Sequence, residues 1–292
     1  MRIAIVGANG QLGTDLVEIS SEDPEFEVVP LTHKDLDVAV LDSLKILKEV
    51  KPDVIINTAA YVRVDDAELH PEKAFAVNAI GALNVARIAN DIGAINVYIS
   101  TDYVFDGEKG GEPYTEEDTP NPINVYGGAS KYAGGEIFTR NYSSKHYIIR
   151  VASLYGKAGA SGKGGNFVEW VIERAKSGEE LRIVDDQFMS PTYTKDVART
   201  LKEFLKLKPE FGGVYHMVNE GFCSWYEFAR AVFKILGWDV QIKPIKSNEL
   251  NRLAKRPRFS ALKNEKLEEL GLNMKPWKEA LKGGYLQEKG YL

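Results

Sequence analysis

The chain opens with MRIAIVGANGQLG (residues 1–13), and this stretch decides the fold. The apolar run at residues 2–6 has the length and composition of a buried strand. Gly7, Gly10 and Gly13 follow in a G-x-x-G-x-x-G loop that opens a helix expected at residues 11–20. Glycine is needed in such a loop because the backbone turns sharply and approaches a pyrophosphate closely. The N–H groups and positive dipole end of the helix then attract the phosphate, so the context predicts a dinucleotide site rather than a mere tight turn.

Strands and helices alternate after this opening. We expect strands at residues 26–31, 53–57, 96–100 and 147–151, and helices at residues 38–50 and 71–92. A stretch rich in Gly, Pro and acids at residues 102–122 is typical of a loop. Such alternation indicates a parallel sheet covered by helices on both faces. We therefore predict an α/β fold, a Rossmann-type doubly wound parallel sheet, with residues 1–155 as its NAD(P)-binding domain.

The pattern changes beyond residue 155. The expected elements are a loop at residues 157–165, helices at 167–177, 194–206 and 224–236, strands at 181–184 and 214–217, and a terminal helix. The segment shows no repeat and no low-complexity tail. We expect residues 156–292 to form a smaller α/β substrate-binding lobe over the carboxyl edge of the sheet. The lobe is predicted to interleave with the first domain and not to fold autonomously.

Composition excludes several classes of function. The net charge of −5 argues against a nucleic-acid partner, which favours basic proteins. Cys223 is the only cysteine, so a disulfide within the chain is impossible, and with four histidines we predict no zinc cluster. An acidic run at residues 116–118 suits either an interface metal or a solvated loop; we prefer the loop and predict no metal. No signal peptide or membrane span is expected, which makes the cytoplasm the default location.

The end of the second expected strand bears on the choice of cofactor. An acid there would bind the ribose hydroxyls of NAD and repel a 2′-phosphate. The sequence instead reads PLTHK at residues 30–34, with His33 and Lys34 in place of an acid. The absence of an acid favours NADPH, with NADH possible. An equally good interpretation is that His33 and Lys34 are two solvated surface residues.

Further segments complete a recognisable pattern. They are NTAAY (57–61), VNA (77–79), STDYVFDG (100–107), NVYG (124–127), SK (130–131), GNF (165–167), DQF (186–188), SPT (190–192), RP (256–257) and SAL (260–262). Together they resemble, nearly end to end, the dTDP-4-dehydrorhamnose reductase family of the extended short-chain dehydrogenase/reductase class. The resemblance implies NADPH-dependent reduction of the 4-keto group of dTDP-4-dehydro-L-rhamnose to give dTDP-L-rhamnose.

The resemblance also implies roles for individual residues. Tyr126 matches the general acid, and Lys131 matches the ammonium that lowers the phenol's pKa from about 10 and holds the nicotinamide ribose. Thr101 matches the hydroxyl that polarises the substrate carbonyl. Matching cofactor-binding positions are Gly7, Asn9, Gly10, Gln11, Leu12, Gly13, Asp37, Val38, Ala59, Ala60, Tyr61, Asn78, Tyr126 and Lys131. Matching substrate-binding positions are Thr101, Asp102, Asn166, Phe167, Ser190 and Arg256.

Three of these interpretations have an equal or better alternative. Asn78 suits either ordering of backbone or water near the site or a helix–helix hydrogen bond. Arg256 suits either a diphosphate clamp or a surface ion pair. The acids of residues 65–68 resemble a carboxylate cluster, but the start of a solvated helix is the better interpretation.

The chain departs from the family pattern at four places. Four residues instead of three separate Tyr126 from Lys131, and one more residue precedes Glu136. Val62 replaces a threonine, and Ser153 stands where many members place a substrate-contacting tryptophan. The absence of this tryptophan leaves open which sugar, or which substituents on the sugar, the protein binds.

The Tyr126–Lys131 spacing leaves the catalytic geometry open. On a regular helix, five steps of roughly 100° leave two side chains roughly 140° apart. We therefore predict that this helix is locally widened, as a π-bulge, or starts late. The alternative is a regular helix with Lys131 in solvent and little or no activity.

Two other functions fit the same sequence. One is a non-catalytic NADP-binding regulatory subunit of the same fold, and the other is a reductase of another 4-keto nucleotide sugar. We prefer the dTDP-4-dehydrorhamnose reductase, for which we expect a dTDP-sugar as the partner and a monomer or homodimer as the oligomeric state.

Overall fold

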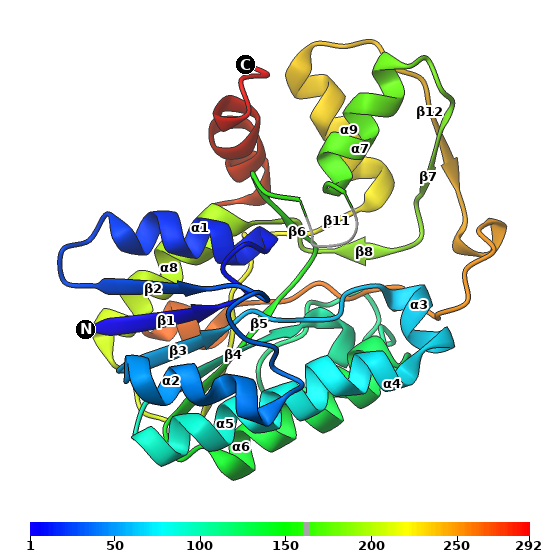
Figure 1. Ribbon diagram of the computed structural model, residues 1–292. Helices are drawn as coiled ribbons and strands as arrows, with labels where there is room; N and C mark the ends of the chain where they lie inside the picture. Colours follow the sequence, from blue (N-terminus) through cyan, green and yellow to red (C-terminus); the bar gives the residue numbers. More distant parts are fainter. Residues whose placement is uncertain (160–163) are drawn as a thin grey trace.

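A six-stranded sheet forms the centre of the protein, in a computed structural model that describes residues 1–159 and 164–292. Its strand order is β10-β5-β4-β3-β1-β2, and all neighbours are parallel. The strands are β1 (Arg2–Val6), β2 (Glu27–Leu31), β3 (Val54–Asn57), β4 (Ile95–Thr101), β5 (His146–Val151) and β10 (Gly213–His216). The predicted Rossmann-type sheet is confirmed, and its carboxyl edge points toward the smaller lobe (Figure 1).

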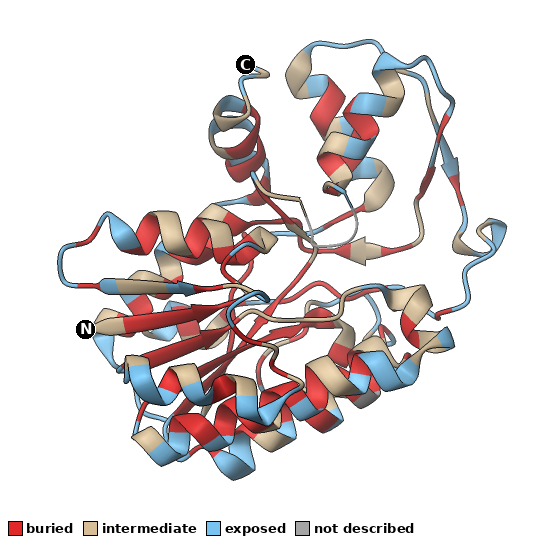
Figure 2. Ribbon diagram, viewed as in Figure 1, coloured by how far each residue is buried: buried red, intermediate tan, exposed pale blue. Residues whose placement is uncertain are grey.

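Helices cover both faces of this sheet, because both faces are apolar. Strand β1 alternates between the two cores: Ile3 and Ile5 pack on one side, and Ala4 and Val6 on the other. The first side is covered by α1 (Gln11–Ser21) and α8 (Thr194–Leu207), and the second by α2 (Lys45–Val50), α5 (Gly81–Ile92) and α6 (Ile137–Tyr142). The central strands are buried along most of their length, as parallel strands between two helical layers must be (Figure 2).

Several helices are less regular than the sequence pattern predicts. The helix expected at 38–50 starts later, as the 3-10 turn η1 (Leu41–Leu44) followed by α2. The Ser43 hydroxyl accepts from Asp37 N at 3.0 Å and the Asp37 carboxylate accepts from Ala39 N at 2.9 Å, so side chains hold this segment in a turn. The helix expected at 71–92 divides into α4 (Pro71–Ala74), the π-helix η2 (Phe75–Ile80) and α5, and α3 (Val64–Leu69) precedes it.

The smaller lobe is built from the later part of the chain. Its helices are α7 (Phe167–Lys176), α9 (Trp225–Leu236), α11 (Trp277–Glu279) and the π-helix η6 (Ala280–Leu286). Short strand pairs accompany them: β6 (Leu154–Tyr155) with β9 (Thr192–Tyr193), β7 (Leu181–Val184) with β12 (Ile242–Ile245), and β8 (Phe188–Met189) with β11 (Cys223–Ser224). The remaining short helices are η3 (Asp102–Val104), η5 (Ser247–Glu249) and α10 (Glu265–Glu269). The loop expected at 157–165 includes residues 160–163, which lie outside the described residues.

The two parts of the chain interleave. Strand β10 and helix α8 come from beyond residue 155, yet β10 pairs with β5 and α8 packs beside α1 in the first core. That residues 156–292 do not fold alone stays a prediction. Within the described ranges, no helix combines the length and apolarity that crossing a membrane requires.

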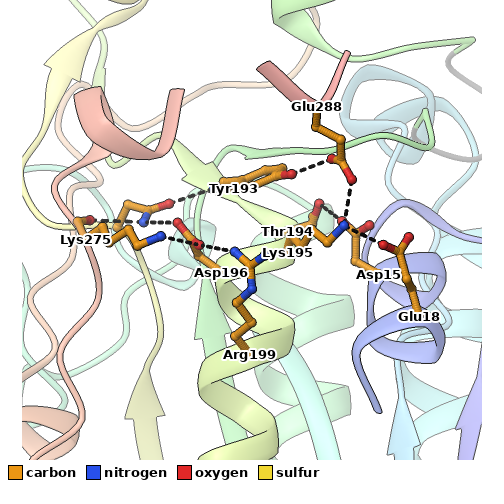
Figure 3. Close-up of polar contacts among 10 residues, drawn as sticks. Asp15, Glu18, Tyr193, Thr194, Lys195, Asp196, Arg199, Lys275 and Glu288 are labelled. Carbon is orange, nitrogen blue, oxygen red and sulfur yellow. Dashed lines mark hydrogen bonds and ion pairs between the residues drawn. The ribbon is translucent and has the colours of Figure 1, made fainter. Parts of the chain in front are cut away.

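A polar cluster joins the lobe to the first domain where α8 begins (Figure 3). Lys195 Nζ lies 2.5 Å from Glu18 of α1 and 2.7 Å from Glu288, just after η6. Beside it, the Thr194 hydroxyl donates to the buried Asp15 carboxylate, and the Tyr193 hydroxyl donates to Glu288. Lys195 is only 14% exposed, so one ammonium holds two carboxylates from different parts of the chain together.

Replacing that ammonium is expected to destabilise the protein. Lys195→Met leaves Glu18 and Glu288 facing each other without the cation, and loss of a part-buried charged hydrogen bond should lower the free energy of unfolding by about 1–2 kcal/mol. Denaturant unfolding measures this change. The matched control is Lys282→Met, an exposed lysine on η6, which should stay near wild type. Equal stability of the two variants would contradict the bridging role.

Candidate active site

One cavity of about 1090 Å³ lies between the carboxyl edge of the sheet and the smaller lobe. Sixteen of the residues expected at the site line it: Gly7, Asn9, Gly10, Gln11, Leu12, Asp37, Val38, Ala59, Ala60, Tyr61, Thr101, Asp102, Tyr126, Lys131, Asn166 and Phe167. Four others are not among its lining residues: Gly13, Asn78, Ser190 and Arg256. The fold therefore brings residues from distant segments to one hollow, as expected at the carboxyl edge of a parallel sheet.

The glycine loop fits a pyrophosphate at one end of this cavity. Gly7 has φ +83°, and a Cβ there would lie 2.6 Å from the Thr58 hydroxyl. A Cβ on Gly13 would lie 2.2 Å from the Gly7 carbonyl oxygen, so only glycine lets α1 pack this close to the turn. No side chain caps the first N–H groups of α1, and the buried Gln11 amide nitrogen has no partner among the described residues. These donors suit an anionic group at a helix N-terminus.

The tip of β2 carries no free carboxylate on the cavity side. Thr32 and His33 line the cavity there. The nearby Asp35 carboxylate turns back to accept from Thr32 N and Oγ1, both at 2.8 Å, and these hydrogen bonds lower its pKa. Asp37, further along, lines the cavity while accepting from Ala39 N.

The helix that carries Tyr126 and Lys131 is widened, as predicted. The π-helix η4 spans Tyr126–Glu136, and Ser130 N donates to the Val125 carbonyl at 3.1 Å in i→i−5 fashion. Both Tyr126 and Lys131 consequently line the cavity. Two glycines allow the close approach: a Cβ on Gly127 would lie 2.0 Å from the Tyr103 carbonyl oxygen, and one on Gly135 would lie 2.0 Å from the Tyr98 hydroxyl.

Burial shifts the titration of both groups toward their neutral forms. Lys131 is 3% exposed; its ammonium donates to the Ile99 carbonyl at 2.6 Å and lies 4.5 Å from the Tyr98 ring centroid. Burial lowers the pKa of Lys131 to about 7, against an opposing effect of Glu136. Burial also raises the pKa of Tyr126, and a hydrogen bond with Thr101 partly offsets that rise.

A buried carboxyl group lies next to Thr101. Asp102 accepts from the Thr101 hydroxyl at 3.0 Å and from the Ser260 hydroxyl at 2.6 Å. Burial raises the pKa of Asp102 to about 6, although these hydrogen bonds act the other way. Ser260 comes from the RPRFSAL segment, so that segment reaches the carboxyl edge of the sheet through this contact.

Two of the expected residues that do not line the cavity, Asn78 and Ser190, have structural partners. Asn78 accepts from Tyr61 N at 2.8 Å and donates to Tyr61 O and to the Ser130 hydroxyl, both at 3.0 Å. It thus orders a backbone segment of the cavity and also bonds one helix to another. The Ser190 hydroxyl accepts from the Leu262 backbone at 3.2 Å.

Arg256 forms an ion pair instead of pointing into the cavity. Its guanidinium donates to both oxygens of Asp65, at 3.0 and 2.6 Å, and this pairing lowers the pKa of Asp65. The neighbouring acids on α3 have separate partners: Asp66 accepts from the Tyr61 hydroxyl, and Glu68 accepts from Val125 N at 2.8 Å. These acids therefore tie α3 to other segments and form no shared cluster.

The lobe supplies cavity residues that the sequence analysis did not single out. They are Glu169, Trp170, Glu173, Trp225 and Phe228, and Ser153 and Tyr155 line the cavity from the segment just before the lobe. Ser153 has φ +42°, an uncommon conformation for a residue other than glycine. The α7 residues carried a usable signal, because Asn166 caps the helix by accepting from Val168 N at 2.9 Å and the others follow at helical spacing.

Fold and cavity together define a class: a Rossmann-type dinucleotide-binding protein with Thr, Tyr and Lys gathered at the carboxyl edge, as in short-chain dehydrogenases/reductases. The chain belongs to the family described as RmlD substrate binding domain, whose sequence model matches residues 1–288. The dTDP-4-dehydrorhamnose reductase family inferred from the sequence is thereby confirmed.

Three similar proteins illustrate the relationship. A crystal structure of dTDP-4-dehydrorhamnose reductase from Bacillus anthracis, in complex with NADP, is 39% identical with a TM-score of 0.90, covering 98% of this chain and 99% of that one. A crystal structure of a dTDP-4-dehydrorhamnose reductase from Clostridium acetobutylicum is 41% identical with a TM-score of 0.91, covering 99% of this chain and 100% of that one. The spore coat polysaccharide biosynthesis protein SpsK of Bacillus subtilis is 38% identical over 99% of this chain and 98% of its own.

The raised pKa of Asp102 predicts how a variant responds to pH. The folded protein binds this proton more tightly than the unfolded chain does, so the associated stability is present below about pH 4 and is lost as pH rises through about 6. Asp102→Asn carries no such titration. The melting temperature of wild type minus that of Asp102→Asn should therefore fall between about pH 4 and pH 7.

Thermal unfolding at a series of pH values makes this measurement. The exposed Glu117, whose pKa is lowered by its hydrogen bond with Lys266, provides a control of opposite sign in Glu117→Gln. A difference for Asp102→Asn that grows with pH would show that its carboxyl group is not destabilised by burial.

Proposed function

We propose that this protein is an NADPH-dependent reductase that converts the 4-keto group of dTDP-4-dehydro-L-rhamnose to the alcohol, giving dTDP-L-rhamnose. The observation that carries the proposal is the common cavity of Thr101, Tyr126 and Lys131, which the widened helix preserves despite the additional residue. The names of the two similar solved reductases support the reaction class. When bound, the cofactor supplies a hydride to the carbonyl carbon.

The side chains at the sheet edge handle the proton. The Tyr126 phenol donates its proton to the keto oxygen, and the Thr101 hydroxyl orients that oxygen by a hydrogen bond. The Lys131 ammonium stabilises the phenolate that remains and brings its pKa toward the working range. The surrounding burial strengthens these interactions, because charges are poorly screened in a water-excluded site.

The glycine-loop end of the cavity is assigned to the cofactor. The α1 N-terminus and the Gln11 amide bind the pyrophosphate, and the tip of β2 receives the adenine ribose. Thr32 and His33 at that tip, with Asp35 engaged by Thr32, favour a 2′-phosphate and hence NADPH over NADH. The NADP bound to the similar Bacillus anthracis enzyme supports this choice.

The lobe end is assigned to the nucleotide sugar. Asn166, Phe167 and the aromatic residues of α7 and α9 enclose it, and Asp102 borders the reacting end. The assignment of Ser190 and Arg256 to substrate binding rests on the family resemblance alone. We further propose that the protein works in the cytoplasm as a monomer or homodimer.

One alternative substrate has a specific observation in its favour. Ser153, where many family members place a tryptophan, lines the cavity with a much smaller side chain. A reductase of another 4-keto nucleotide sugar is therefore the second candidate. The regulatory-subunit alternative drew its support from the altered Tyr126–Lys131 spacing, whereas the widened helix keeps both side chains at the cavity.

NADPH oxidation in the presence of dTDP-4-dehydrorhamnose tests the proposal directly. Tyr126→Phe should lower kcat by about 10²- to 10⁴-fold, because the proton donor is lost while the ring remains. NADPH affinity, measured by calorimetry, should stay close to wild type. A Tyr126→Phe variant that reduces the keto sugar at the wild-type rate would exclude Tyr126 as the acid.

A second variant tests the cofactor end. Gly10→Val should abolish dinucleotide binding, because its side chain occupies space that the pyrophosphate needs next to the α1 N-terminus. Calorimetric titration with NADPH and with NADH measures the loss and the preference between the two. Equal titrations for wild type and Gly10→Val would contradict the loop assignment, and tighter binding of NADH would contradict only the cofactor preference.

A further inference from the structure

A fully buried ion pair lies beneath the widened helix. The Glu136 carboxylate at the end of η4 accepts from Arg150 Nε at 2.9 Å and from Arg150 Nη2 at 2.8 Å. It also accepts from the Ser100 hydroxyl at 2.6 Å. The side chains of Glu136 and Arg150 are 0% and 1% exposed. Three contacts thus fasten the last residue of η4 to two neighbouring strands, β4 and β5.

The stability of the folded protein does not explain why a charged pair is buried here. The desolvation of a buried ion pair offsets most of its Coulomb attraction, and apolar replacements of similar volume are often as stable. Arg150 Nη1 in addition has no hydrogen-bond partner among the described residues, although the guanidinium lies 5.2 Å from the Phe105 ring centroid, and an unpaired buried donor makes the pair costlier. The presence of this ion pair is therefore better explained by its effect on the groups that it faces.

The spacing along η4 supplies that explanation. Tyr126, Lys131 and Glu136 follow one another at intervals of five residues. A π-helix bonds i to i+5, so residues five apart lie nearly above one another on one face. In a regular α-helix the same residues would diverge by roughly 140° at each step. The widened helix therefore aligns the acid, the ammonium and the carboxylate toward β4.

Glu136 follows Lys131 by five residues on η4, and its negative charge acts on the Lys131 ammonium. Around Lys131 lie the Tyr98 ring and the Ile99 carbonyl on β4, and Tyr126 one turn back on η4. Asp102 in η3 is engaged by Thr101 and Ser260. Two cations face the Glu136 carboxylate: Arg150 of β5 is hydrogen-bonded to it, and Arg140 of α6 lies 3.8 Å from it.

We propose that Glu136 is a positioning residue: held by Arg150 and Ser100, it fixes the end of the widened helix and presents its negative charge to the Lys131 ammonium at the cavity wall. It touches neither substrate nor cofactor and acts through Lys131. Its charge opposes the desolvation of that ammonium and keeps more of it protonated near neutral pH. The catalytic consequence of this inference rests on the proposed function. The effect of Glu136 on the protonation of Lys131 does not.

The first measurement is the protonation of Lys131, and the second is the pH dependence of turnover. In protein with isotope-labelled lysine, NMR titration reports the protonation of Lys131, identified by the signal that Lys131→Met removes. Glu136→Gln should move the Lys131 titration to lower pH by about one unit, because an opposing charge is lost. The high-pH limb of kcat, where the ammonium deprotonates, should move in the same direction. Glu136→Asp, which keeps the carboxylate, should restore most of the wild-type titration.

Glu116→Gln is the matched control. Glu116 is also a buried carboxylate, but it accepts from His216 N at 2.9 Å and lies outside η4, so its loss should leave the Lys131 titration in place. Where Glu136→Gln fails to fold, Glu136→Gln with Arg150→Met removes both buried charges and should still lower the Lys131 titration, but by less than Glu136→Gln alone, because the positive charge of Arg150 is lost as well.

Three results would overturn the inference. They are a lower melting temperature without any shift of the Lys131 titration, an equal shift in Glu116→Gln, and an unshifted double variant. Absence of turnover in wild type would refute the proposed function instead, and the NMR titration would still decide the role of Glu136.

Discussion

The five-residue spacing of Tyr126, Lys131 and Glu136 is the constraint on which the site depends. Only i→i+5 bonding brings these side chains to one face, and only close packing of the helix against β4 and η3 brings that face to the cavity. Gly127 and Gly135 permit the packing, since a Cβ at either would collide with Tyr103 or Tyr98. The irregular helix is thus fixed at its ends and along its face, which is why it persists.

Burial at the sheet edge shifts three titratable groups toward neutrality. The pKa of Tyr126 and of Asp102 rises, while that of Lys131 falls. Each shift has desolvation as its largest cause, so the same exclusion of water that strengthens hydrogen bonding also destabilises charge. Fixed partners moderate the effect: Thr101 for Tyr126, Ser260 for Asp102 and Glu136 for Lys131. The pKa values at the site are therefore set by desolvation on one side and by a few fixed hydrogen bonds and charges on the other.

The cavity exists because the chain crosses between its two parts several times. After β5 the chain enters the lobe, returns as α8 and β10 to complete the first sheet, and leaves again for α9 and the C-terminal helices (Figure 1). Lys195 and Asp15 fasten the return point, and Ser260 brings a late segment back to Asp102. Each wall of the cavity is therefore supported by both parts of the chain.

The sequence by itself determined the parallel sheet, the glycine loop and the need for an irregular helix at Tyr126, because hydrophobic periodicity, glycine and residue spacing are local properties. Sixteen of the twenty site residues that it predicted line the cavity, since parallel strands end at one edge. Only the tertiary structure decided that Arg256 pairs with Asp65, that Ser260 bonds Asp102, and that Glu136 meets Arg150. These partners lie far apart along the chain, and no local pattern encodes a contact that depends on how two packed segments meet.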